Sequence, residues 1–354
     1  MPELPEVEIT ARRLDAALRG ARIESALAPG INALKTFDPP LAALAGREIA
    51  GVSRRGKQLI VSIGGPSGSA SGAHGTHAAS GEHGTHGASG EHGAHGASGE
   101  HGASGEHAAS GEHAASGASG EHAASGEHGA SRPGGELVLL IHLMSAGRLQ
   151  LYDRHAGPRD RTSRVLVRVD GGRELRLREF GSKQAAWAKL LPADRLADDD
   201  ALARLGPEAW PQPPQPAELA ELLDVPRPLH ALLRDQHVIA GIGRSWVDEI
   251  LWRARLSPYK RGADLVGEEP ARLREAIVAT LGGALEHYES AVRLPIPDKL
   301  PLPLQVHRHE GKPCPRCGAT LRAVHFEDYI IAYCPDCQTA GRVLKDRRLS
   351  RLLK

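Results

Sequence analysis

A repetitive segment, residues 65–134, limits what the chain can fold into. It repeats Ala-Ser-Gly-Glu-His with small variations and contains almost no large apolar residues. Such a composition cannot bury enough apolar surface to offset the entropy lost on ordering, so we expect the segment to be disordered. The core of this 354-residue chain must therefore come from the residues on either side, which suffice for two domains.

The residues next to the repeat have the composition of β-strands. Residues 58–63 precede it and residues 136–142 follow it, so we interpret the repeat as an expanded hairpin loop in a β-rich region. Eleven of the 19 histidines lie in the repeat, which leaves metal binding open, although neutral repeat expansion is the simpler interpretation.

The rest of the chain changes from β-rich to helical. A helix is expected from Pro5 to Leu18, and proline-rich residues 211–228 are expected to form the domain junction. Further strands are predicted at residues 148–152, 165–169 and 174–178, and helices at residues 230–234, 247–254 and 270–288. Short strands are expected around the cysteines at the end of the chain.

The charge distribution favours a polyanionic partner for the second half of the chain. The formal net charge is only +1, but residues 65–134 carry −6 from seven glutamates and Arg132, which leaves +7 on the rest. Between Arg227 and Lys354 there are 21 Lys and Arg against 15 Asp and Glu. This excess fits nucleic acid, and a solvated surface of mixed charge is the alternative.

Nothing in the sequence indicates export or a membrane span. No segment reaches the roughly 18 consecutive apolar residues that cross a membrane. The first residues include Glu3, Glu6 and Glu8 and lack the apolar run of a signal peptide. We therefore expect a cytoplasmic protein, associated with the nucleoid if its source is bacterial.

The four cysteines stand in two pairs near the end of the chain. Cys314-x-x-Cys317 and Cys334-x-x-Cys337 are separated by 16 residues. Pairs at this spacing can place four thiolates tetrahedrally around one Zn²⁺, whereas a redox-active dithiol would be expected within a βαβ pattern. We predict one structural zinc ion, which by itself specifies no function.

The opening residues, Met1-Pro2-Glu3, can carry chemistry. Removal of Met1 would expose the secondary amine of Pro2, and an α-amino group has a pKa of about 7.7–8.0, so part of it is unprotonated at neutral pH. Such an amine can attack a sugar carbon and form an imine, with Glu3 moving protons. On these residues alone, an ordinary helix start is the alternative.

Five segments, in order, resemble the formamidopyrimidine-DNA glycosylase and endonuclease VIII family. They are residues 1–8, residues 53–57, the pair 141–144 and 178–181, residues 241–249, and the paired Cys-x-x-Cys unit. The resemblance implies an α+β protein with an N-terminal β-sandwich-like domain and a C-terminal helix–two-turn–helix domain that ends in a zinc-finger β-hairpin. The implied domains are residues 1–210, 211–300 and 301–354, with double-stranded damaged DNA bound between them.

The resemblance also assigns roles to residues. Pro2 would attack C1′ of the damaged nucleotide, Glu3 would be its acid/base partner, and Lys57 would contact a phosphate beside the lesion. The other residues implied at the DNA site are Glu6, which would help to hold the active site, Met144, Arg178, Phe180, Gly241, Gly243 and Arg244. A solvated lysine is the alternative for Lys57, and an ordinary core aromatic is the alternative for Phe180.

This chain departs from the family pattern at several positions. Arg244 replaces the usual asparagine after Gly-x-Gly, and Tyr329, beside Glu327 and Asp328, replaces the arginine of the finger. We expect Arg244 to bind phosphate in place of the asparagine, and the acids to change how the finger docks. Met144 lies one place before the usual void-filling methionine, and residues 294–300 are too short for a long lesion-capping loop.

The resemblance implies a bifunctional glycosylase and abasic-site lyase that removes 8-oxoguanine and formamidopyrimidine bases through an imine on Pro2. It would act as a monomer in base excision repair, with zinc but without a redox or nucleotide cofactor. An endonuclease VIII-like enzyme for oxidised pyrimidines is the alternative within the family. A non-catalytic protein that binds abasic or distorted DNA is the alternative from another class.

Overall fold

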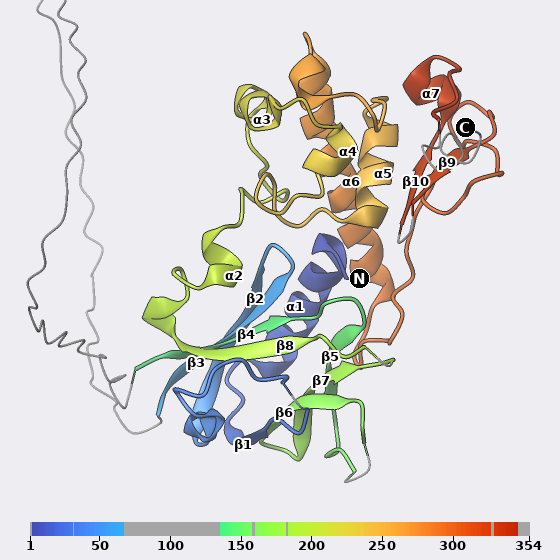
Figure 1. Cartoon of the computed structure of the whole chain (residues 1–354). Coiled ribbons are helices and arrows are strands. Elements are labelled where there is room, and N and C mark those ends of the chain that lie inside the picture. The colour runs from blue at the N-terminus through green and yellow to red at the C-terminus, as the bar shows by residue number, and fades with distance from the viewer. Residues whose placement is uncertain are drawn as a thin grey trace, which may run out of the picture. The chain divides into compact units, whose positions relative to one another are not determined.

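Two four-stranded antiparallel sheets form the first half of the structure (Figure 1). The computed structural model describes residues 2–30, 32–66, 135–157, 160–181, 183–326 and 329–345. Residues 65–134 were expected to be disordered. Apart from residues 65 and 66, this segment lies outside the described residues. Glu327 and Asp328 also lie outside them.

The two sheets have the strand orders β1-β6-β7-β5 and β2-β3-β4-β8. The strands are β1 (Ile23–Leu27), β2 (Arg47–Arg55), β3 (Gln58–Pro66), β4 (Leu137–His142), β5 (Gly147–Tyr152), β6 (Ser163–Val169), β7 (Arg173–Glu179) and β8 (Trp187–Pro192). Helix α1 (Leu4–Leu18) precedes them, and the short helices η1 (Leu41–Leu44), η2 (Ala193–Arg195) and α2 (Asp200–Ala203) accompany them. The predicted β-sandwich-like domain is confirmed.

One apolar core joins the inner faces of both sheets. Leu139 of β4 and Val167 of β6 belong to the same buried cluster and are 1% and 3% exposed. The other face of β4 is covered as well, because Leu140 packs in a second cluster with Leu196 and Leu202. Since both faces are buried, β4 is a continuous apolar run instead of an alternating strand.

The two strands predicted beside the repeat are hydrogen-bonded neighbours. β3 and β4 pair antiparallel, with Ile63 opposite Leu137 and Gln58 opposite His142. The residues that flank the long insert therefore continue one hairpin, as the sequence predicts.

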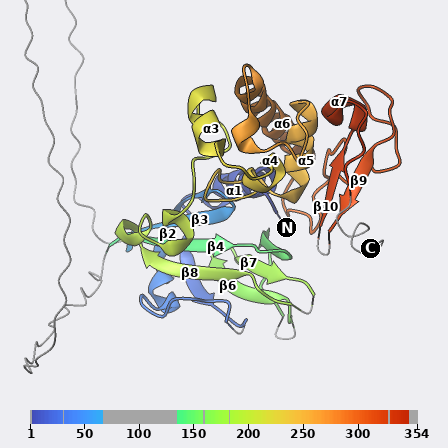
Figure 2. The same cartoon turned by 45° about the horizontal axis from the view of Figure 1, so that its top comes forward.

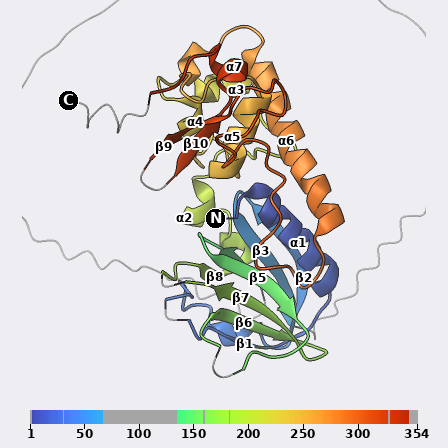
Figure 3. The same ribbon diagram turned by 90° about the vertical axis from the view of Figure 1, so that its right-hand side faces the viewer.

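The second half of the structure is helical (Figure 2). It contains α3 (Pro216–Leu223), α4 (Leu229–Leu232), α5 (Arg244–Arg253), η3 (Gly262–Asp264) and α6 (Glu269–Ala291). Helix α6 packs against both α5 and α1, so it joins the helical region to the start of the chain (Figure 3). None of the helices that the structure describes is both long and apolar enough to span a membrane.

The last described residues form a small hairpin module. Strands β9 (Arg322–His325) and β10 (Ile330–Tyr333) pair antiparallel, and α7 (Pro335–Thr339) follows. Two acids of α5 fix this module and the segment before it. Asp248 accepts a hydrogen bond from the N–H of Ala332, and Glu249 accepts from the N–H of Val306 and His307.

The proline-rich stretch 211–228 contains a helix in addition to the connection that the sequence predicts. Pro216 occupies the first turn of α3, where proline fits, and Gln215 with Glu218 closes a capping box. Leu219 and Leu223 are fully buried against the other helices. The prolines therefore start a packed helix here.

Candidate active site

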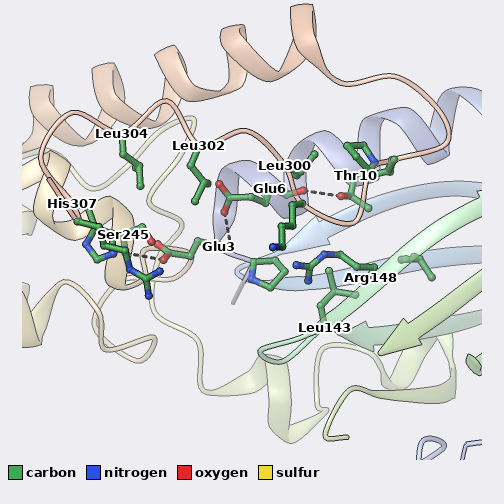
Figure 4. Close-up of a pocket in the computed structure, with 16 residues that line it drawn as sticks. Glu3, Glu6, Thr10, Leu143, Arg148, Ser245, Leu300, Leu302, Leu304 and His307 are labelled. Atoms are coloured by element: carbon green, nitrogen blue, oxygen red, sulfur yellow. Dashed lines mark hydrogen bonds between the residues drawn. The ribbon is translucent and has the colours of Figure 1, made fainter. Parts of the chain in front are cut away.

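A pocket of about 300 Å³ lies between the start of α1, the β4–β5 turn, α5 and the segment after α6. Pro2, Glu3 and Glu6 line it from the N-terminal side. Leu300, Leu302 and Leu304 reach it from one side and Leu143 and Arg148 from the other (Figure 4). The residues predicted to carry the chemistry therefore meet at a mostly apolar cavity.

Glu3 is held by the N-terminus of α5. Its carboxylate oxygens accept hydrogen bonds from the N–H of Ser245 at 2.9 Å and the N–H of Trp246 at 3.3 Å. These groups are unpaired donors of the first helical turn, where a negative charge is favoured. Glu3 is only 3% exposed, so its carboxylate is fixed beside Pro2 by the backbone of a helix more than 240 residues away.

Gly241 and Gly243 allow the start of α1 to lie close to the N-terminus of α5. A Cβ on Gly243 would lie 2.3 Å from Cδ of Glu3, and a Cβ on Gly241 would lie 2.4 Å from Cδ1 of Leu4. Gly241 also has a φ of +107°, a conformation that L side chains rarely adopt. The N–H of Gly241 donates to Oε1 of Gln236.

Glu6 lines the pocket and is held by contacts with three other residues. It is 7% exposed, and its carboxylate accepts from the N–H of Glu3, Nε1 of Trp246 and the hydroxyl of Tyr288. Burial, and then the charge of Glu3, raises the pKa of Glu6 to about 7. Glu6 therefore links α1, α5 and α6 and fits the expectation that it helps to hold the site.

Lys57 lies in the turn between β2 and β3 and is buried, not solvated. It is 6% exposed, and burial lowers the pKa of its ammonium group. Glu3 and Glu6 oppose this shift, while the charges of Arg234 and Arg244 add to it. Lys57 thus stands near both the acids of α1 and two arginines of the helical region.

The residues expected to fill a gap in the DNA stack lie on the β4–β5 turn and at the end of β7. Met144 has a positive φ of 49°, and its N–H donates to Nδ1 of His142. Phe180 is half-buried, outside the core clusters, and its ring lies 4.7 Å from the Arg178 guanidinium. Arg178 donates to Oγ1 of Thr162 and the hydroxyl of Tyr152.

Tyr329, which stands where the family has an arginine, is the centre of an aromatic and cationic cluster. Its ring stacks on Phe326 at 4.5 Å with an interplanar angle of 4°. The guanidinium groups of Arg234 and Arg244 lie over it at 4.3 Å and 5.3 Å. Arg244 is exposed at the first residue of α5.

The four cysteines come together in the hairpin module. All four Sγ atoms lie within 4.8 Å of one another, and Cys317 and Cys334 are 3.4 Å apart. Zinc–sulfur bonds of about 2.3 Å in a tetrahedron would place the sulfurs roughly 3.8 Å apart. The donor set and its spacing therefore fit one zinc ion held by Cys314, Cys317, Cys334 and Cys337.

Sequence reasoning missed several residues of this site. Trp246 and Tyr288, which hold Glu6, lie far from it along the chain, and no sequence pattern links them to it. Arg148 lines the pocket and donates from Nε to the backbone oxygen of Asp298 at 2.5 Å. Arg234 was read only as the end of a helix, although it stands one residue before the Asp-Gln that leads into the glycine turn.

Comparisons with known proteins identify the class to which this architecture and this site belong. Residues 1–81 match the model of the formamidopyrimidine-DNA glycosylase N-terminal domain, and residues 205–295 match that of the formamidopyrimidine-DNA glycosylase H2TH domain. The chain is 36% identical over 214 residues to the formamidopyrimidine-DNA glycosylase of Roseiflexus sp., covering 58% of this chain and 75% of the relative. The chain belongs to the formamidopyrimidine-DNA glycosylase family.

Two further comparisons agree. A formamidopyrimidine-DNA glycosylase-like protein of Mycobacterium tuberculosis, described as uncharacterized, is 41% identical over 126 residues, which is 36% of this chain and 80% of that protein. The fold is similar to that of Lactococcus lactis Fpg in complex with DNA that contains N7-benzyl-Fapy-dG. That match has a TM-score of 0.68 and 22% identity and covers 96% of this chain and all of the other.

Proposed function

We propose that the chain is a bifunctional DNA glycosylase and abasic-site lyase that acts through the amine of Pro2. The observation that carries this proposal is the position of Pro2 and Glu3 at one pocket, with the Glu3 carboxylate fixed by two N–H groups of α5. Loss of Met1 leaves a secondary amine whose pKa of about 7.7–8.0 suits a nucleophile at neutral pH.

The reaction uses groups that are already in place. The nitrogen of Pro2 attacks C1′, the bond from C1′ to the base breaks, and the base leaves with a proton. Glu3 transfers a proton to the sugar ring oxygen as the ring opens, which gives an iminium ion between the nitrogen of Pro2 and C1′, because a secondary amine has no second proton to lose. Elimination of the 3′ phosphate and then the 5′ phosphate leaves a one-nucleotide gap, and water releases Pro2.

The DNA contacts follow from the same arrangement. Lys57 binds a phosphate beside the lesion, and Arg244 binds phosphate in place of the family's asparagine. Phe180 enters the stack from the minor groove, while Met144 and Arg178 take the space of the extruded base. Zn²⁺, held by the four cysteines, stabilises the hairpin module and takes no part in bond making.

The domains proposed for these tasks are residues 1–210 for catalysis, residues 211–300 for helix–two-turn–helix DNA binding, and residues 301–354 for the finger and tail. The base class is proposed as 8-oxoguanine and formamidopyrimidine. Oxidised pyrimidines are the second candidate base class. Residues 294–300 form a short segment, and its Ile296 and Leu300 line the pocket directly.

Borohydride trapping on a panel of labelled duplexes tests the proposal. The panel holds an abasic site, 8-oxoguanine opposite cytosine and an oxidised pyrimidine, and the protein is checked by mass for loss of Met1 and by metal analysis for zinc. We expect a covalent adduct that is lost in Pro2→Gly, and the base that gives an adduct identifies the lesion class. Absence of any adduct would favour a non-catalytic protein that binds abasic DNA.

A further inference from the structure

Lys57, Arg234 and Arg244 are three cations near the candidate active site. Among the described residues, no ion pair involves Lys57 or Arg234. Lys57 is buried, and Nη1 of Arg234 is a buried nitrogen that makes no hydrogen bond within the described part of the chain. A buried cation without a partner is costly, so a group that supplies negative charge at this place would be stabilising.

Three segments bring these cations together. Lys57 comes from the β2–β3 turn, Arg234 from the turn after α4, and Arg244 from the start of α5. The two arginines meet at one ring, because both guanidinium groups lie over Tyr329, at 4.3 Å and 5.3 Å. Their charges lower the pKa of Lys57, whereas the charges of Glu3 and Glu6 raise it. Two guanidinium groups held at one ring favour an anion with several oxygens, such as phosphate.

Tyr329 fixes the arginines in this arrangement. The Arg234 guanidinium lies over its ring at 4.3 Å, which is within the range of a cation–π contact. The ring is itself held by Phe326 at 4.5 Å and lies parallel to the buried ring of His230 at 6.0 Å. A guanidinium that stacks on a ring keeps the N–H groups along its edge available for hydrogen bonds, which suits an oxyanion.

We propose that Arg234 binds a phosphate of the DNA backbone together with Lys57, and that Tyr329 is the positioning residue that holds Arg234 for this contact. The finger thus contributes to DNA binding through an aromatic ring that supports an arginine from the α4–α5 turn, instead of through an arginine of its own. This inference rests on the proposed function, because it takes duplex DNA as the ligand.

The salt dependence of DNA binding tests the proposal. Affinity for a duplex with a tetrahydrofuran abasic analogue is measured between about 50 and 200 mM salt for the zinc-loaded, full-length protein. The variants are Arg234→Ala, Arg234→Lys, Tyr329→Phe and Tyr329→Leu. Arg173→Ala is the matched control, since Arg173 begins β7 whereas Arg178 and Phe180 lie at its other end, and it pairs with Asp170.

We expect Arg234→Ala to reduce the slope of log affinity against log salt by about one, the change for one lost phosphate contact. Arg234→Lys should retain the slope because it keeps the charge. Tyr329→Leu should weaken binding about two- to fivefold, the worth of an exposed cation–π contact, while Tyr329→Phe keeps the ring and binds as wild type. Arg173→Ala should bind as wild type.

A purely structural role for Arg234 would lower the melting temperature or zinc content without changing the slope, so both are measured on every variant. If Arg234→Ala does not fold, the slope is read on Arg234→Gln. An unchanged slope in the neutral variant overturns the inference while wild-type binding leaves the proposed function intact. If wild type itself shows no salt-dependent binding and no trapping, the proposed function fails.

Discussion

The acidic and the basic sides of the candidate site differ in how their charges are matched. On the acidic side, Glu3 and Glu6 accept hydrogen bonds from the N–H groups of Ser245 and Glu3 and from the side chains of Trp246 and Tyr288. On the basic side, Lys57 and Arg234 have no ion-pair partner among the described residues. Among the described residues, the acids of the site therefore have partners of opposite polarity, whereas Lys57 and Arg234 form no ion pair.

This difference separates two functions. The carboxylates must hold one geometry before substrate arrives, because proton transfer depends on distance and orientation. We propose that phosphates of the ligand complete the contacts of Lys57 and Arg234, and that their negative charge offsets the cost of burying these cations. Variants on the acidic side should therefore change the rate of reaction, and variants on the basic side should change binding and its salt dependence.

The largest effect is expected for Glu3→Gln. The amide can accept only one of the two N–H groups that the carboxylate accepts, and it cannot carry the proton. Loss of a general acid/base group costs about 10²- to 10⁴-fold in rate. Single-turnover excision and abasic DNA affinity should be measured together, with Glu24→Gln, at an exposed position of β1, as the control. A rate within threefold of wild type, or an equal loss of affinity, would contradict the comparison.

A smaller loss is expected for Gly243→Ala. The added Cβ would lie 2.3 Å from Cδ of Glu3 and would force the carboxylate away from the N-terminus of α5. A displacement of about 1 Å at a catalytic group can cost roughly 100-fold. Gly283→Ala is the control, because its Cβ would meet nothing within 4 Å on helix α6. Activity that is equal in the two variants would show that this contact does not position Glu3.

The sequence predicted the central strands better than the edge strands. β4 could be predicted because its sequence is a continuous apolar run, which follows from the burial of both its faces. β1, β2 and β8 were not assigned as strands, and each lies at an edge of its sheet. Edge strands pair on one side only, and β2 includes arginines and a glycine that weaken any alternating pattern.

Some residues of the candidate site could also be predicted from the sequence, and others could not. Pro2, Glu3 and Lys57 could be predicted because each stands in a short local motif. The partners that define their environment come from distant segments, such as Tyr288, which is 282 residues from Glu6. Such pairings depend on how α1 packs against α6, which no local pattern specifies. Tyr329 could be identified as a departure, but not as the ring that supports Arg234.

The smallest expected effect is on the pH dependence of stability. Its measurement tests whether Glu6 has the raised pKa that its burial indicates. Burial and the charge of Glu3 raise the pKa of Glu6 from 4.5 to about 7. Between these values the folded protein keeps a proton that the unfolded chain has released. The free energy of unfolding contributed by Glu6 is therefore full below pH 4.5 and is lost as the pH rises through about 7.

Glu6→Gln does not titrate, so its melting temperature, relative to wild type, should rise by a few degrees between pH 5 and pH 8. Glu24→Gln should follow wild type at every pH, and a Glu6→Gln curve parallel to wild type would mean that Glu6 is ionised in the folded protein across this range.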